Sequence, residues 1–259
     1  MKLRFACALA VALAAACSVV SPSLAVLPTA KSAAGYSYAG LIGTRGPHGI
    51  AASLTAVDAP VVRGGHVAAW VGVGGRYEGP GGQDEWLQVG LSSGRGSGNT
   101  LYYEWTRPGD AIHYVQVAQG LPVGQAVPVM VLQMSGRADT WRVWVNGAPV
   151  GDPIILPGSD AKLTPMATAE NWDGGAGAVN SYSYRFDGVR VARTAGGVWR
   201  PFAGATPRAD AGNTLQQFAS SFVASTTPPP GTVASAGVAP ADTVAENPVP
   251  GHRLGQDLP

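Results

Sequence analysis

The sequence predicts an all-β protein, a sandwich or jelly roll of about eight or more antiparallel strands. The chain has 36 Gly and 21 Pro among 259 residues, and this abundance of turn-forming residues argues against a helical bundle. Between residues 36 and 202 the apolar residues recur with a period of two, which is typical of strands with one buried face. Gly, Pro, Asn and Asp separate the alternating segments, so short turns are expected between them.

Eight segments carry the strand pattern most clearly, and we treat them as the predicted elements. In chain order they cover residues 66–73, 85–92, 100–106, 113–118, 127–134, 140–145, 165–170 and 181–191. Asn146-Gly147 directly follows the segment 140–145, and this dipeptide is a strong signal for a two-residue hairpin turn. We therefore assign residues 36–203 to a single β-sandwich.

The N-terminal residues have the features of a signal peptide. Lys2 and Arg4 precede an apolar run at residues 5–16, and Ser23-Leu24-Ala25 has the small-residue pattern of a cleavage site. We expect residues 1–25 to be removed after about Ala25, which makes the protein secreted. The apolar run is shorter than the ~20 residues that span a bilayer, so no transmembrane anchor is expected.

Two further expectations concern the ends of the chain. Residues 26–35 are expected to be a linker, and Cys17, which follows three alanines, offers a lipid anchor as the alternative to secretion. Leu215, Phe218 and Phe222 fall at helical spacing, which predicts a short amphipathic helix at residues 210–224. Residues 225–259 are rich in Pro and Ala and lack aromatic residues, which predicts a disordered tail.

Charge and cysteine content exclude several classes of function. With 17 basic and 16 acidic side chains the chain has no basic stripe for nucleic acid. Cys7 and Cys17 both lie in the leader, so the mature chain has no disulfide or cysteine nucleophile. The four histidines show no spacing typical of metal ligands, and we expect neither a metal nor a cofactor. We expect a monomer.

The alternation also assigns side chains to the two faces of each strand. Val67, Ala69, Val71 and Val73 share an aliphatic face, as do Leu87, Val89 and Leu91. The opposite faces carry aromatic, amide and acidic side chains beside glycine, and they place together Trp70, Trp86, Gln88, Tyr102, Glu104, Glu170 and Trp172. Repeated Trp beside Gly indicates a partly dry groove that suits an extended ligand. The alternative is that these aromatic side chains only cover a second core layer.

Four motifs in this region resemble those of the glutamic peptidases, the eqolisins. They are Ala69-Trp70-Val71-Gly72-Val73-Gly74-Gly75, Trp86-Leu87-Gln88-Val89-Gly90-Leu91, Tyr102-Tyr103-Glu104-Trp105 and Thr168-Ala169-Glu170-Asn171-Trp172. Their order and approximate spacing match those of the family, and the resemblance covers roughly half of the chain. It implies a concanavalin-like jelly-roll sandwich with a catalytic glutamine and glutamate on its concave sheet.

The resemblance implies that Gln88 and Glu170 are the catalytic pair. The family's Leu-Gln-x-Gly motif corresponds to Leu87-Gln88-Val89-Gly90, and its Ala-Glu-Trp motif most nearly matches Ala169-Glu170-Asn171-Trp172. The sequence departs from the family's pattern at three positions. Gly74 and Ser92 stand where the family has acidic residues, and Asn171 displaces the tryptophan that follows the glutamate.

This chemistry requires only a carboxylate and an amide. Glu170 would take a proton from the attacking water and return it to the leaving amine, and Gln88 would stabilise the developing oxyanion. Trp70, Trp86, Tyr102 and Trp172 would hold an extended peptide or an unfolded polypeptide, with Glu104 orienting it. The sequence thus predicts a secreted endopeptidase.

Three other functions are considered for the same residues. The alternative is a noncatalytic module on the same fold that binds glycans or extended peptides. Gly90-Leu91-Ser92-Ser93-Gly94 matches the pattern of a serine nucleophile elbow, but a Gly-rich loop follows it instead of a helix. Glu104, Glu170 and Asp173 would supply the carboxylates of a glycosidase, but they are not clustered on one strand.

Overall fold

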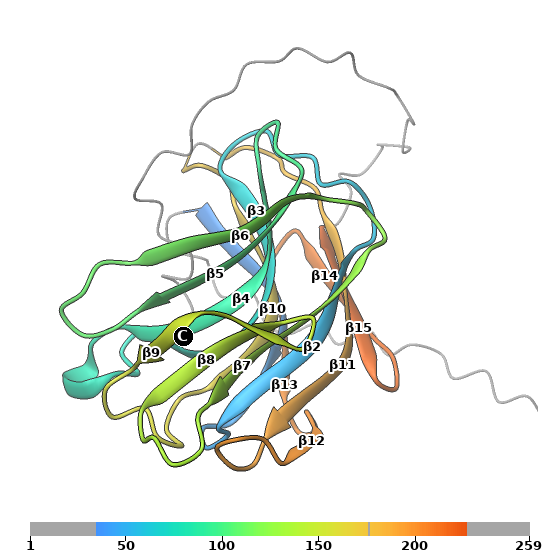
Figure 1. Cartoon of the computed structure of the whole chain (residues 1–259). Helices are drawn as coiled ribbons and strands as arrows, with labels where there is room; N and C mark the ends of the chain where they lie inside the picture. The colour runs from blue at the N-terminus through green and yellow to red at the C-terminus, as the bar shows by residue number, and fades with distance from the viewer. Residues whose placement is uncertain (1–34, 176, 227–259) are drawn as a thin grey trace, which may run out of the picture.

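The computed structural model describes residues 35–175 and 177–226, and these form two antiparallel β-sheets packed face to face (Figure 1). The all-β sandwich predicted from the sequence is confirmed. The predicted signal peptide, residues 26–34 of the predicted linker and residues 227–259 of the predicted tail lie outside the described residues. Ser225 and Thr226, which the prediction gave to the tail, are instead the end of a strand, because their backbone pairs with neighbouring strands.

The first sheet has seven strands in the order β13-β1-β10-β3-β4-β5-β6. Neighbouring strands in this order run antiparallel. The strands are β1 (Tyr36–Ile42), β3 (His66–Gly75), β4 (Glu85–Gly94), β5 (Asn99–Thr106), β6 (His113–Leu121), β10 (Pro165–Trp172) and β13 (Thr206–Ala209).

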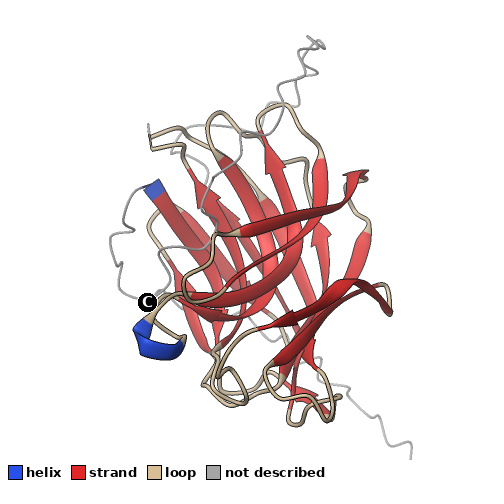
Figure 2. Ribbon diagram, turned by 60° about the vertical axis from the view of Figure 1, so that its left-hand side comes forward, coloured by secondary structure: helices blue, strands red, loops and turns tan. Residues whose placement is uncertain are grey.

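The second sheet has eight strands, seven of them in the order β14-β15-β11-β2-β7-β8-β9, while β12 pairs with β11. Its strands are β2 (Gly49–Ala56), β7 (Ala126–Gln133), β8 (Thr140–Val145), β9 (Ala148–Ile155), β11 (Ser183–Ala192), β12 (Trp199–Pro201), β14 (Asn213–Gln217) and β15 (Ser221–Thr226). Figure 2 shows strand almost throughout, with a short 3-10 turn, η2, at Pro80–Gly82. None of the helical turns in the described part is long and apolar enough to cross a membrane.

The core lies between the two sheets and uses the aliphatic strand faces that the alternation predicts. Val67, Val71, Leu87 and Val89 from the first sheet are fully buried. They join one continuous apolar cluster with second-sheet side chains that include Leu54, Val129, Val143, Phe186 and Phe222. Because the side chains of a strand alternate, burying one face in this core turns the other face of β3, β4, β5 and β10 away from it.

The predicted hairpin after β8 is also confirmed. Asn146 and Gly147 join β8 to β9 with φ angles of 50° and 78°. Both values lie in the left-handed region that a type I′ turn requires, and Asn-Gly is the dipeptide that adopts it at least cost.

The predicted helix at residues 210–224 is wrong. This segment forms the β14–β15 hairpin, in which Gln217 pairs with Phe222. Leu215, Phe222 and Ala224 are buried in the core, whereas Phe218 lies exposed at the turn. The spacing of Leu215 and Phe222 that suggested a helix arises because a tight turn separates two strands that face the same core. The second strand also contains Val, Ser and Thr, which suit a strand better than a helix.

Candidate active site

The face of the first sheet that points away from the core carries a second buried cluster, which we call the site face. Its apolar part consists of Tyr36, Tyr38, Ala68, Trp70, Tyr102 and Met166, with Ile42 and Trp172 packed against it. Three polar residues share this face: Gln88 of β4 pairs with Glu104 of β5, and Glu170 of β10 pairs with Ala68 of β3, the strand between β10 and β4. Their grouping on one face follows from the alternation in each strand.

Glu170 is held at the middle of this sheet, on β10, between β1 and β3. Its backbone pairs with Tyr38 on one side and Ala68 on the other, and the residue is 0% exposed. The Oε1 atom lies 3.0 Å from the Nε2 atom of His66, and Trp70 donates its indole N–H to Oε2 at 3.4 Å. Both carboxyl oxygens therefore have a nitrogen partner, as a buried carboxylate requires.

Gln88 lies on β4, where Gly72 faces it from β3 and Glu104 from β5. It is 2% exposed, and its Nε2 atom donates to the hydroxyl of Tyr102 at 3.2 Å. A Cβ atom at Gly72 would lie 2.9 Å from the Cβ of Gln88, so the glycine makes room for the amide side chain.

Glu104 is a buried acid, and among the described residues only one of its two carboxyl oxygens has a hydrogen-bond partner. Trp86 donates its indole N–H to Oε1 at 3.3 Å, while Oε2 has no hydrogen-bond partner among the described residues. Burial, and next to it the nearby carboxyl of Glu170, raise the pKa of Glu104 well above its ordinary value. Burial, followed by the charges of Glu104 and Glu170, likewise raises the pKa of Tyr102. The carboxyl groups of Glu104 and Glu170 therefore both influence the hydroxyl group of Tyr102.

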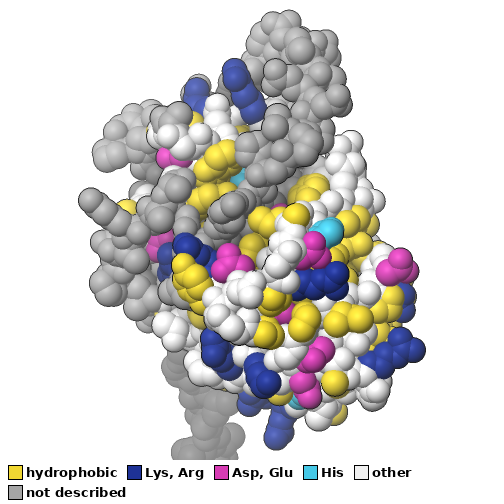
Figure 3. All heavy atoms as spheres, turned by 90° about the vertical axis from the view of Figure 1, so that its left-hand side faces the viewer, with side chains coloured by type: hydrophobic (Ala, Val, Ile, Leu, Met, Phe, Trp, Pro, Cys, Tyr) yellow, Lys and Arg dark blue, Asp and Glu magenta, His cyan; other side chains and the backbone are white. Residues whose placement is uncertain are grey.

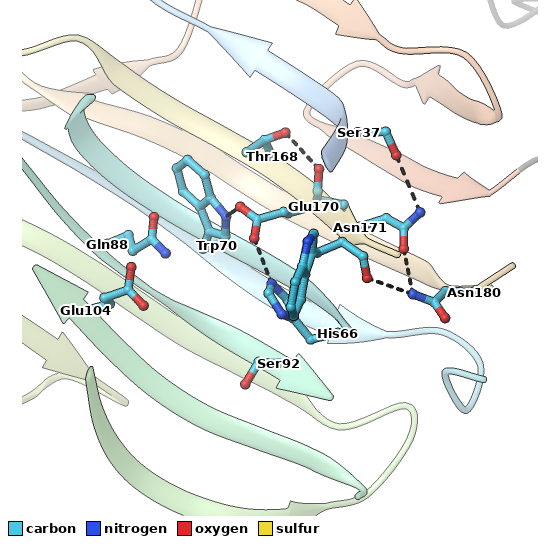
Figure 4. A network of polar contacts seen from close by, with 12 residues as sticks. Ser37, His66, Trp70, Gln88, Ser92, Glu104, Thr168, Glu170, Asn171 and Asn180 are labelled. Carbon is cyan, nitrogen blue, oxygen red and sulfur yellow. Dashed lines mark hydrogen bonds and ion pairs between the residues drawn. The ribbon is translucent and has the colours of Figure 1, made fainter. Parts of the chain in front are cut away.

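Figure 4 shows how the polar groups lie around Trp70. Gln88 and Glu104 lie on one side of the indole, and Glu170 and His66 lie on the other. A cavity of about 10 Å³ is lined by Trp70, Gly72, Val73, Gly74, Gly75, Trp86, Leu87 and Gln88. That volume is close to the space a single water molecule occupies. Gln88 and Glu170, the catalytic pair predicted from the sequence, therefore share one face of the sheet but lie on opposite sides of the Trp70 indole. The small cavity is lined by Gln88 and not by Glu170.

The predicted substrate-binding residues lie at different depths. Trp70, Trp86, Tyr102 and Glu104 are buried on the site face, whereas Trp172 is only half-buried. The Trp172 ring stacks on Tyr36 with centroids 5.9 Å apart. Trp172 is therefore the aromatic side chain of this set that is most open to a ligand, and the buried ones support the polar groups.

A larger cavity of about 560 Å³ lies elsewhere in the molecule. Its lining includes Leu41, Arg190, Trp199, Phe202 and Phe218. None of the polar residues of the site face lines it, and it holds no carboxylate or histidine. The size of this cavity alone is therefore no reason to propose a catalytic site there.

His66 is the site residue that the sequence analysis missed. The spacing of the histidines along the chain gives it no role. Within residues 35–175 and 177–226, no three His, Cys, Asp or Glu side chains gather closely enough to hold a metal. The alternation of β3 could have identified His66 from the sequence, because His66, Ala68 and Trp70 occupy the same face of the strand.

The three departures from the eqolisin pattern have structural consequences. Gly74 has a φ of 87°, and a Cβ there would lie 2.1 Å from the carbonyl oxygen of Glu85, so this backbone excludes an aspartate. Ser92 lies on the site face with its hydroxyl 3.3 Å from that of Tyr114. Asn171 bonds to Ser37 and Asn180 instead of facing the site.

Comparison with solved structures gives the fold a known counterpart. The structure superposes on scytalido-glutamic peptidase bound to a peptide-based transition state analogue with a TM-score of 0.54 and 15% sequence identity, covering 77% of this chain and 100% of that one. It superposes on SCP-B, an eqolisin-family peptidase in complex with the tripeptide Ala-Ile-His, with a TM-score of 0.52, 16% identity and the same coverage. This chain has the eqolisin fold.

The eqolisin fold predicted from the sequence is therefore confirmed by structure, although the sequence identity is low. No protein-family model matches the chain, and no curated protein does. At 15% and 16% identity the likeness establishes the arrangement of strands and leaves the role of each side chain to be argued from its own geometry.

Proposed function

We propose that this protein is a secreted glutamic-type endopeptidase that hydrolyses peptide bonds in extended or unfolded polypeptides. The observation that carries the proposal is the presence of a buried carboxylate, Glu170, and a buried amide, Gln88, on one sheet face, one on each side of Trp70. An acid that exchanges protons and an amide that donates a hydrogen bond are the two groups that acyl transfer to water requires.

In the proposed reaction Glu170 acts first as a base. It takes a proton from a water molecule while the water oxygen attacks the carbonyl carbon of the scissile peptide bond. The electron pair of the carbonyl bond moves to its oxygen, giving a tetrahedral oxyanion, and the amide N–H of Gln88 donates to that oxygen. Protonated Glu170 then gives its proton to the leaving nitrogen, the C–N bond breaks, and the carboxyl and amino products form.

The surroundings of the pair favour this chemistry. Gln88 and Glu170 are almost fully buried, and hydrogen bonds to a developing charge are stronger where water is excluded. The hydroxyl of Tyr102 contacts the Gln88 amide and fixes its direction. Burial raises the pKa of Glu104 well above its ordinary value, which favours the neutral form of this second acid over a further negative charge on the site face.

Digestion of an unfolded protein by purified residues 26–259, from about pH 2 to pH 7, tests the proposal. Glu170→Gln removes the base, and Gln88→Ala removes a donor worth about 2.7–4 kcal/mol, so we expect the latter to lower kcat by about 10²–10³-fold. The exposed residues Asp152 and Gln125 provide the matched controls Asp152→Asn and Gln125→Ala, which should retain full activity.

The result can also decide against hydrolysis. Absence of cleavage at every pH, together with binding of glycans or intact peptides, would replace the peptidase by a noncatalytic binding module. N-terminal sequencing of protein recovered from the medium tests secretion separately, because cleavage after about Ala25 and a lipid-modified Cys17 give different N-termini.

A further inference from the structure

His66 lies beside Glu170 in a setting that its position on β3 creates. Glu170 pairs with Ala68, which stands midway between His66 and Trp70 on the same face of β3. The small side chain of Ala68 leaves space for the carboxyl group, so the two nitrogen groups that flank Ala68 reach one carboxyl oxygen each. The carboxyl group of Glu170 is thus held from both sides by one strand.

We infer that His66 is a positioning residue that fixes the carboxyl group of Glu170 for proton transfer, an inference that rests on the proposed peptidase function. The last torsion of a glutamate side chain is broad, so a carboxyl group bonded through one oxygen turns readily. A second donor on the other oxygen removes that freedom. The 3.0 Å contact of His66 is shorter than the 3.4 Å contact of Trp70, so His66 supplies the stronger constraint.

The chemistry of the three groups fixes the direction of these bonds. An ionised carboxylate only accepts hydrogen bonds, and an indole N–H only donates. While Glu170 is ionised, as its proposed role as a base requires, the Nε2 atom of His66 therefore carries a hydrogen toward Oε1 of Glu170. Each oxygen then receives one N–H group and keeps a further lone pair for the water that Glu170 would deprotonate.

Aromatic neighbours hold the His66 ring in this orientation. The ring centroid lies 5.4 Å from that of Trp172 on β10 and 6.1 Å from that of Tyr36 on β1. The side chain is only 11% exposed, so it is not free to turn into solvent. The role of His66 has two separable parts, packing by the ring and donation by Nε2.

Two variants separate these parts. His66→Phe keeps a ring for packing and removes the donor, while His66→Gln keeps an amide N–H at a similar reach. We expect His66→Phe to lower kcat on a peptide substrate about 10²-fold with KM changed less than about threefold, because misplacing a reacting group by about 1 Å costs that much. His66→Gln should recover kcat to within about tenfold of the wild type. A fully active His66→Phe variant overturns the inference.

A second measurement decides the role of His66 even if the wild-type protein cleaves nothing, which would refute the proposed function. The indole N–H of Trp70 reports on the same carboxyl group and is seen by ¹H–¹⁵N NMR, with Trp70→Phe identifying its signal. In His66→Phe we expect this signal to shift and to exchange faster with solvent, and in His66→Gln to stay near its wild-type position. An unchanged signal and exchange rate in His66→Phe would show that His66 does not orient Glu170.

Discussion

The buried acid Glu85 should make the stability of the protein depend on pH, and Glu85→Gln should remove that dependence. Glu85 begins β4 and is fully buried, and neither carboxyl oxygen has a hydrogen-bond partner among the described residues. Burial, and after it the charge of Asp139, raise the pKa of Glu85 from 4.5 to about 7. The folded protein therefore binds this proton more tightly than the unfolded chain does.

The free energy of unfolding should fall as the pH rises from about 4.5 to about 7. A tenfold change in proton affinity corresponds to about 1.4 kcal/mol, so the full effect is roughly 3 kcal/mol. Glu85 follows the exposed residues 81–83, so solvent close to this buried carboxyl group reduces the effect, and we expect about 2 kcal/mol. The Glu85→Gln variant should match the wild type near pH 4.5 and exceed it by that amount near pH 8.

Urea unfolding followed by tryptophan fluorescence at several pH values between 4.5 and 8 measures this difference. Asp152→Asn, which changes an exposed acid, is the control and should follow the wild-type curve. If the curves of the wild type and Glu85→Gln run parallel across this range, the buried carboxyl does not hold its proton and the reasoning fails.

Three further predictions concern the site face and the core. Glu104→Gln should raise the free energy of unfolding at neutral pH but not near pH 4, because burial raises the pKa of Glu104; equal effects at both pH values in denaturant titrations would contradict this. Trp141→Phe removes a 2.7 Å hydrogen bond to the buried Ser159 and should cost about 1–3 kcal/mol in the same assay. Gly90→Ala places a Cβ 2.0 Å from the carbonyl oxygen of Ala69, so β3 and β4 must move apart and the melting temperature should fall. An unchanged melting temperature would contradict this prediction.

The part of the fold that depends on local alternation could be predicted from the sequence. The eight predicted strand segments correspond to β3–β8, β10 and β11, with ends that differ by a few residues. The strand β9 was missed because Pro149, Gly151 and Pro153 interrupt its pattern, which is tolerated since β9 lies at the edge of its sheet. The β14–β15 hairpin was mistaken for a helix because spacing alone does not reveal a tight turn.

The candidate site could be predicted in part. Alternation placed Gln88 and Glu170 on faces away from the aliphatic core, and the structure has them on one site face. Alternation predicts the face on which a side chain lies, but it does not predict which strands are neighbours. The contact of His66 with Glu170 depends on the pairing of β3 with β10 and could therefore not be predicted from the local pattern. The positive φ of Gly74 was equally invisible in the sequence.

The composition of the chain indicates the charge of its surface but not the environment of its buried acids. The balance of 17 basic and 16 acidic side chains predicts no basic stripe for nucleic acid, and on the face shown in Figure 3 acidic and basic side chains are interspersed among apolar ones. The buried acids Glu85 and Glu104, in contrast, had no signature in the composition. Their altered proton affinity arises from burial, which only the packed structure reveals.

The place of β10 between β1 and β3 has a consequence for biosynthesis. Its neighbours are both synthesised long before it, and β13, which closes the sheet beside β1, is synthesised later still. Pairings between segments so distant along the chain form slowly. A nascent polypeptide that has not yet emerged past β10 therefore cannot assemble the site face, because the place between β1 and β3 is filled only when the segment that carries Glu170 has been synthesised.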